Sequence, residues 1–64
     1  MTPEIKLEVT ERVLPDRTVF FADAYFRIDK GTPLIKRSRS GATDLEAVGK
    51  VMREVAKAIE TYYD

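Results

Sequence analysis

The sequence predicts a two-layer α+β domain, in which a three-stranded antiparallel meander sheet carries one C-terminal helix packed across one face (β-β-β-α). Three observations support this prediction. Polar and apolar residues alternate through two long segments, turn residues separate three such segments, and the last third of the chain repeats its apolar residues at intervals of three and four. Because the chain has 64 residues, we expect residues 1–64 to form a single small domain.

The first strand is predicted from an alternation that begins near the N-terminus. Apolar residues occupy the odd positions Ile5, Leu7, Val9 and Val13, and polar residues occupy the even positions between them. A period of two places one set on a buried face and the other on a wet face. Glu11 is the one polar residue in the odd series.

Two turns divide the rest of the sheet. Residues 14–17 (Leu-Pro-Asp-Arg) and residues 30–33 (Lys-Gly-Thr-Pro) have the composition of tight turns. We therefore expect a second strand from Thr18 to about Asp29 and a third from Leu34 to Ser40. Turns this short make the three strands antiparallel neighbours.

The second strand shows which face of the sheet is buried. All its even positions are apolar, whereas its odd positions mix apolar and charged residues. We expect the helix to cover the even face: Phe20, Ala22, Ala24, Phe26 and Ile28. The odd face has no remaining segment to cover it.

The helix is predicted to begin after Thr43, which can act as its N-cap with Glu46 at the third helical position. One stripe of the helix is expected to face the sheet: Leu45, Val48, Met52, Val55, Ile59 and Tyr62. The apolar arc is wider than this stripe. It runs from Ala58 and Val51 through Val55, Ile59 and Leu45 to Ala56 and Gly49 and spans about half the circumference, more than the roughly 100° that one core face needs.

The composition argues against catalysis. The chain has no His and no Cys, so it lacks the commonest general base, the commonest metal ligands and any disulfide. We expect no catalytic residues, no cofactor, no metal site and no small-molecule substrate. A membrane-spanning run and a signal peptide are not evident, so the expected location is the cytoplasm.

The uncovered sheet face is the predicted binding surface. Two large aromatics of the second strand lie on it, and aromatics and Arg dominate many interfaces. For the third strand, either Ile35, Arg37 and Arg39 or Lys36 and Ser38 share this face. The first set is favoured, because small Ser38 fits more easily under a helix. The predicted interface comprises Phe21, Tyr25, Arg27, Ile35, Arg37 and Arg39.

The leading functional hypothesis is a non-enzymatic protein-interaction module. A small adaptor, inhibitor or antitoxin-like protein fits it, with self-association as a homodimer expected. The alternative is a nucleic-acid-binding module in which basic residues hold phosphates and an aromatic stacks on a base. Its candidate residues are Lys30, Lys36, Arg37, Arg39 and Tyr25. The net charge of zero weighs against it, and charges on an edge strand also protect that edge from aggregation.

Residues 41–47 (Gly-Ala-Thr-Asp-Leu-Glu-Ala) are similar to the Gly-x-Thr-x-x-Glu-Ala helix entry of HicB-type antitoxins. The strand and helix order also resembles double-stranded-RNA-binding domains and the arm-type DNA-binding domains of phage integrases. The Pro-Asp-Leu-Pro-Gly stretch of HicB proteins has no counterpart, and the Lys-Lys pair that opens the last helix of the RNA-binding domains is missing. The sequence is therefore assigned to no family.

Overall fold

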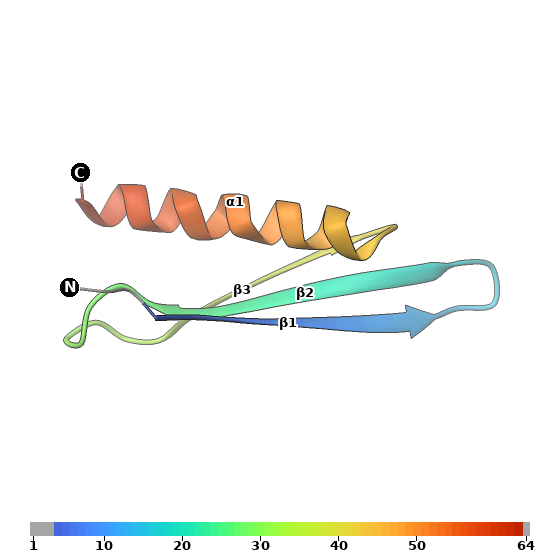
Figure 1. The fold of residues 1–64 in the computed structure, drawn as a ribbon, viewed down its shortest axis with the longest axis horizontal. Coiled ribbons are helices and arrows are strands. Elements are labelled where there is room, and N and C mark those ends of the chain that lie inside the picture. Colours follow the sequence, from blue (N-terminus) through green and yellow to red (C-terminus); the bar gives the residue numbers. More distant parts are fainter. Residues whose placement is uncertain (1–3, 64) are drawn as a thin grey trace.

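A computed structural model of the chain, in which residues 4–63 are described, contains three strands and one helix. The strands are β1 (Glu4–Val13), β2 (Thr18–Arg27) and β3 (Ile35–Gly41), and the helix is α1 (Asp44–Tyr63). The strands form one antiparallel sheet in the order β1-β2-β3. The helix lies along one side of this sheet (Figure 1). The predicted β-β-β-α architecture is confirmed.

The β1–β2 hairpin is long and regular. Its register runs without an offset from Glu4↔Arg27 to Val13↔Thr18. The turn is closed by the Leu14 amide, which donates to the Arg17 carbonyl at 2.7 Å. Glu11 stays in register opposite Phe20. The acidic residue in the apolar series therefore does not bulge the strand.

The turn between β2 and β3 is held by Asp29 and Thr32. The Thr32 amide donates to the Asp29 carbonyl at 3.0 Å, and the Thr32 hydroxyl donates to the same carbonyl at 2.7 Å. The Asp29 amide donates back to that hydroxyl at 3.0 Å. These bonds satisfy the polar groups of the turn and return the chain to β3.

The core is small and contains many alanines. Among the residues that the structure describes, it consists of seven buried ones, three of which are Ala: Ala22, Ala24, Phe26, Ile28, Ala47, Val51 and Val55. The even face of β2 supplies the sheet side, as the alternation predicted. Small side chains at the centre of both layers bring the helix backbone close to the sheet.

The helix meets the sheet on a stripe that overlaps the predicted one but is rotated from it. Of the predicted residues, Val55 is buried, and Val48 and Ile59 pack against the core. Leu45 is 79% exposed and Met52 37% exposed, whereas Ala47 and Val51 are fully buried. Two polar contacts to β3 fix this rotation. Arg39 forms an ion pair with Glu54 at 2.6 Å, and the Lys50 ammonium donates to the Ser40 carbonyl at 3.1 Å. The predicted stripe was wrong at Leu45, Met52 and Tyr62, which are exposed, because the apolar arc is wide enough for two orientations.

The preferred face of β3 was also wrong. Ile35, Arg37 and Arg39 pair with Phe26, Ala24 and Ala22, so they lie on the helix side of the sheet. Ile35 packs against the core, and Arg39 extends to Glu54 along the edge of the helix. The long arginine stems can follow the helix edge while their charged heads stay in water. The residues of β3 on the uncovered face are Lys36, Ser38 and Ser40.

The start of the helix is capped as predicted, with one difference. The Thr43 hydroxyl accepts a hydrogen bond from the Glu46 amide at 3.1 Å. The Glu46 carboxylate accepts from the Ala42 amide at 3.4 Å, one residue before the N-cap. Lys50, 3.2 Å from the same carboxylate, holds the pKa of Glu46 below its usual value, and the Ala42 bond lowers that pKa further.

Gly41→Ala should destabilise the fold. A Cβ at Gly41 would lie 2.8 Å from the Ala47 nitrogen and 3.0 Å from the Glu46 side chain, so the helix start would have to move. Strain of this kind costs about 1–3 kcal/mol. Gly49→Ala is the matched control, because a Cβ there meets nothing within 4 Å and Ala is favoured over Gly by about 1 kcal/mol inside a helix. The urea midpoint of unfolding, followed by circular dichroism, should fall for Gly41→Ala and rise for Gly49→Ala. A Gly41→Ala variant of unchanged stability would contradict the packing of the helix start.

The Glu46 cap should make stability depend on pH. Because the pKa of Glu46 is lowered in the folded state, its contribution is present above the unfolded pKa and is lost as pH falls through the folded one. Glu46→Gln should therefore lower the melting temperature at neutral pH, and the difference from wild type should vanish in acid. Glu60→Gln, on an exposed part of the same helix, is the control. A difference that is constant with pH would contradict this role.

Candidate protein-interaction surface

The helix covers only part of the sheet. It packs over β2 and β3, while β1 lies beyond it at the edge (Figure 1). Ile5, Leu7 and Val9 pair with Phe26, Ala24 and Ala22, so they face the helix side of the sheet. They are nevertheless 45%, 41% and 46% exposed. These three residues, which we call the β1 stripe, lie on the same sheet face as the core but outside the area that the helix covers.

One flank of the helix extends this apolar surface. At about 100° per residue, Glu54 and Lys50 lie on one side of buried Val51, and Met52 lies on the other. Glu54 and Lys50 contact β3, so the Met52 side faces β1. The apolar residues on this side form the helix flank: Leu45, Val48, Met52 and Ile59. The β1 stripe and the helix flank thus border the same exposed strip, which lies on the helix side of the sheet.

The amount of exposed apolar side chain is large for the size of the core. Only four buried core residues are larger than alanine, whereas nine large hydrophobic residues in the described chain are exposed. Single exposed apolar residues need no explanation, but a continuous group indicates a binding surface. The β1 stripe and the helix flank supply five of the nine: Ile5, Leu7, Val9, Leu45 and Met52.

No strand among residues 4–63 pairs with the outer edge of β1, so this edge also offers main-chain groups. The bond from Leu14 to Arg17 makes that opposed pair a hydrogen-bonded one. Such pairs alternate along an antiparallel ladder, so the even residues of β1 point their N–H and C=O groups toward β2. The odd residues, including the β1 stripe, point theirs away from the sheet. The same residues therefore present apolar side chains and free main-chain hydrogen-bonding groups.

The opposite edge of the sheet is different. β3 is shorter, with seven residues against ten in β1, and carries Lys36, Arg37 and Arg39. Short length and positive charge are two ways in which edge strands avoid pairing with other chains. The edge of β1 differs in being longer and in carrying charges of both signs: Glu4, Lys6, Glu8, Glu11 and Arg12.

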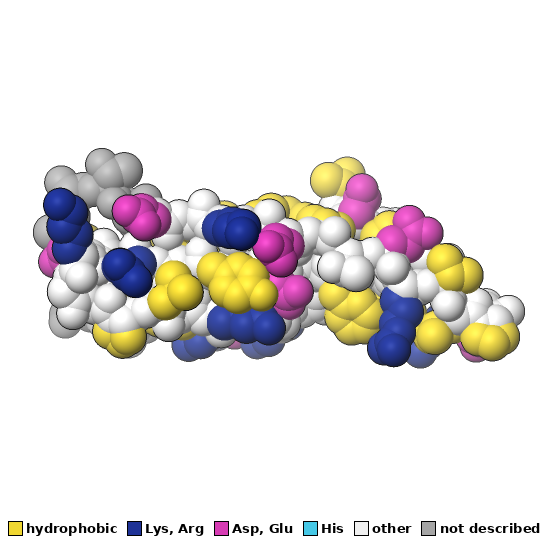
Figure 2. All heavy atoms as spheres, turned by 90° about the horizontal axis from the view of Figure 1, so that it is seen from below, with side chains coloured by type: hydrophobic (Ala, Val, Ile, Leu, Met, Phe, Trp, Pro, Cys, Tyr) yellow, Lys and Arg dark blue, Asp and Glu magenta, His cyan; other side chains and the backbone are white. Residues whose placement is uncertain are grey.

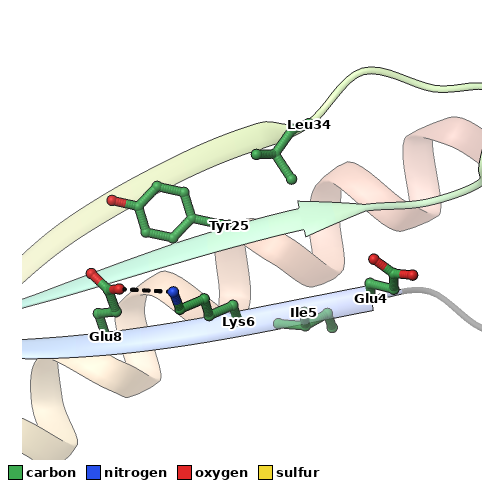
Figure 3. Close-up of a pocket in the computed structure, with 6 residues that line it drawn as sticks. All are labelled: Glu4, Ile5, Lys6, Glu8, Tyr25 and Leu34. Atoms are coloured by element: carbon green, nitrogen blue, oxygen red, sulfur yellow. Dashed lines mark ion pairs between the residues drawn. The ribbon is translucent and has the colours of Figure 1, made fainter.

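The uncovered sheet face carries the aromatics that the sequence placed there. Tyr25 lies between Lys6 and Lys36 on the neighbouring strands. The Lys36 ammonium is 5.5 Å from the centre of the Tyr25 ring, and Lys6 forms an ion pair with Glu8 at 3.3 Å (Figure 3). The ring borders a shallow depression of about 310 Å³. Tyr25 is half-buried between these neighbouring strands.

Phe21 and Arg27 share this face and are also half-buried. Phe21 lies between Thr10 and Ser40 and borders a second open depression of about 420 Å³. Arg27 pairs with Glu4 in the register, and its Nε is buried with no hydrogen-bond partner among the described residues. Neighbouring strands already cover part of both side chains. The uncovered sheet face with Phe21 and Tyr25, which we call the aromatic face, is therefore less exposed than the β1 stripe.

The uncovered face carries charges of both signs. Glu8 and Asp23 lie directly opposite each other, and the Ser38 hydroxyl donates to Asp23 at 2.5 Å. Viewed from the side away from the helix, acidic, basic and apolar side chains are interspersed (Figure 2). Lys36 lies on this face, whereas Arg37 and Arg39 lie on the other. The basic residues proposed for nucleic-acid binding are thus not gathered on one surface.

Within residues 4–63, no three His, Cys, Asp or Glu residues are placed to hold a metal ion. The helix described there is not long and apolar enough to cross a membrane. The sequence correctly placed Phe21, Tyr25 and Arg27 on one face, but it missed the β1 stripe as an exposed group. The signal in the sequence that could have revealed this exposure was the prediction of three strands with a single helix to cover them.

The comparisons with known proteins add no relative. No protein-family model, curated protein or solved structure matches the chain. The function is therefore inferred from the surface of the protein itself.

Proposed function

We propose that this protein is a non-enzymatic protein-interaction module that binds through the β1 stripe, the helix flank and the free edge of β1. The observation that carries the proposal is the exposure of Ile5, Leu7 and Val9, each above 40%, on the face that elsewhere forms the core. An adaptor, an inhibitor or an antitoxin-like protein would act by such binding.

Two kinds of interaction support this proposal. Complete burial of a Leu, Ile or Val side chain is worth about 1.5–3 kcal/mol, and roughly half of each β1 stripe residue is still available. The odd residues of β1 also offer outward N–H and C=O groups to an added strand. Strand addition at a sheet edge obtains affinity from the main chain and specificity from alternate side chains. One partner can satisfy both.

The nucleic-acid alternative has less support. Arg39 is already paired with Glu54, and the uncovered face places Glu8 and Asp23 beside its lysines. Carboxylates at these positions would repel phosphates. The aromatic face remains the competing protein-binding surface, and the experiment below separates it from the β1 stripe.

A photoreactive p-benzoylphenylalanine at Val9 should form covalent adducts with the bound partner in living cells. The same residue at Arg53, on an exposed part of the helix, should not. The expected difference arises because Val9 lies within the proposed interface and Arg53 lies outside it. Adducts are detected by gel shift and mapped by mass spectrometry. Equal labelling from both positions, or none from Val9, would overturn the proposed function.

Two serine substitutions identify the face. Leu7→Ser should lower the adduct yield from Val9 about tenfold, because it removes apolar area that the partner covers. Phe21→Ser, on the uncovered face, should leave that yield unchanged. Circular dichroism confirms that both variants are folded. The reverse result, loss with Phe21→Ser only, would move the interface to the aromatic face.

A further inference from the structure

We propose that the partner at this surface is a second copy of the chain, joined by antiparallel pairing of β1 with β1 and centred on Leu7. This inference rests on the proposed function, because it names the occupant of the same surface. The pairing would extend the three-stranded sheet into one continuous sheet of twice that width.

The first requirement is that apolar side chains of both copies share one face. In an antiparallel pair, opposed residues lie on the same face, so odd residues must meet odd residues. The odd residues also hold the outward main-chain groups, as the bond from Leu14 to Arg17 indicates. Registers in which odd meets odd therefore satisfy side chains and main chain together.

Among these registers, the one centred on Leu7 opposes no like charges, and no apolar residue to a charged one, within residues 4–10. Leu7 meets Leu7 of the second copy, and Ile5 meets Val9. On the other face Lys6 meets Glu8, and Glu4 meets the neutral Thr10. By two-fold symmetry each unlike pair occurs twice. Cross-strand pairs of opposite charge and of apolar residues are the stabilising ones.

Neighbouring registers bring unfavourable pairs together. Centring on Lys6 places two lysines opposite each other and pairs Glu4 with Glu8. Centring on Glu8 places two glutamates opposite each other and pairs Ile5 with Glu11. A centre at Val9 pairs Leu7 with Glu11 and Lys6 with Arg12. Glu11 thus excludes the registers centred on Glu8 and Val9, because it would meet an apolar residue in both. Like charges exclude the register centred on Lys6.

A single cysteine tests the centre of the pairing. The chain contains no Cys, so Leu7→Cys introduces the only thiol. Opposed hydrogen-bonded residues have Cα atoms about 5.5 Å apart, within the range for a disulfide. Oxidised glutathione, which accepts the two electrons, should convert Leu7→Cys into a covalent dimer. Val9→Cys is the control, because its two copies would lie about 13 Å apart along the seam. Dimer formed equally by Val9→Cys, or by neither variant, would overturn the proposed register.

Charge reversal tests the same register without oxidation. Lys6→Glu places two glutamates opposite each other at both symmetric positions, and Glu8→Lys places two lysines there. Each variant alone should dimerise roughly 10- to 30-fold more weakly than wild type in sedimentation equilibrium. An equimolar mixture of the two should recover the affinity, because every Glu then meets a Lys. Arg12→Glu, outside the overlap, is the control and should dimerise as wild type. A mixture as weak as the separate variants would refute the pairing.

The outcomes separate this inference from the proposed function. If purified wild-type protein keeps the mass of one 7.3 kDa chain at all concentrations, while Val9 adducts in cells contain another protein, the second copy is the wrong partner and the proposed function stands. If Val9 forms no adduct in cells or in purified protein, both are wrong.

Discussion

The architecture depends on a mismatch of width between one helix and three strands. Strands in a sheet are about 4.8 Å apart, and a helix with its side chains is about 10–12 Å across. One helix therefore covers about two strands. Here it covers β2 and β3, and the remaining strand, β1, has apolar side chains that no other element of the described chain covers.

The choice of which strand stays uncovered follows from the short connection between β3 and the helix. Only Ala42 and Thr43 separate Gly41 from Asp44, so the helix must start directly above the end of β3. Gly41 lies against the first helical turn, and the ion pair from Arg39 to Glu54 holds the middle of the helix to the same strand. The hairpin partner β1 is on the far side of β2. Its exposure is a consequence of connectivity rather than of its own sequence.

This explains how much the sequence could predict. The alternation of β2 correctly gave the buried face, because all its even positions are apolar. The alternation of β3 was misread, because charged or polar residues occupy both of its faces and Ile35 alone distinguishes them. The helix stripe was ambiguous since the apolar arc covers about half of the circumference. Ion pairs such as Arg39–Glu54, which settle that ambiguity, join residues far apart in sequence and leave no local pattern.

The exposed surface has features that a merely unprotected strand would not need. The residues of the β1 stripe are as apolar as those of the core, although they gain little from the helix. The edge of β3 carries three basic residues, so this fold contains the ordinary means of keeping an edge unpaired. On β1, Lys6 and Glu8 instead carry opposite charges around Leu7, and Glu11 interrupts the apolar series only near the far end. That arrangement permits pairing in one register and opposes its neighbours. A surface that only had to avoid association would be served better by charges of one sign.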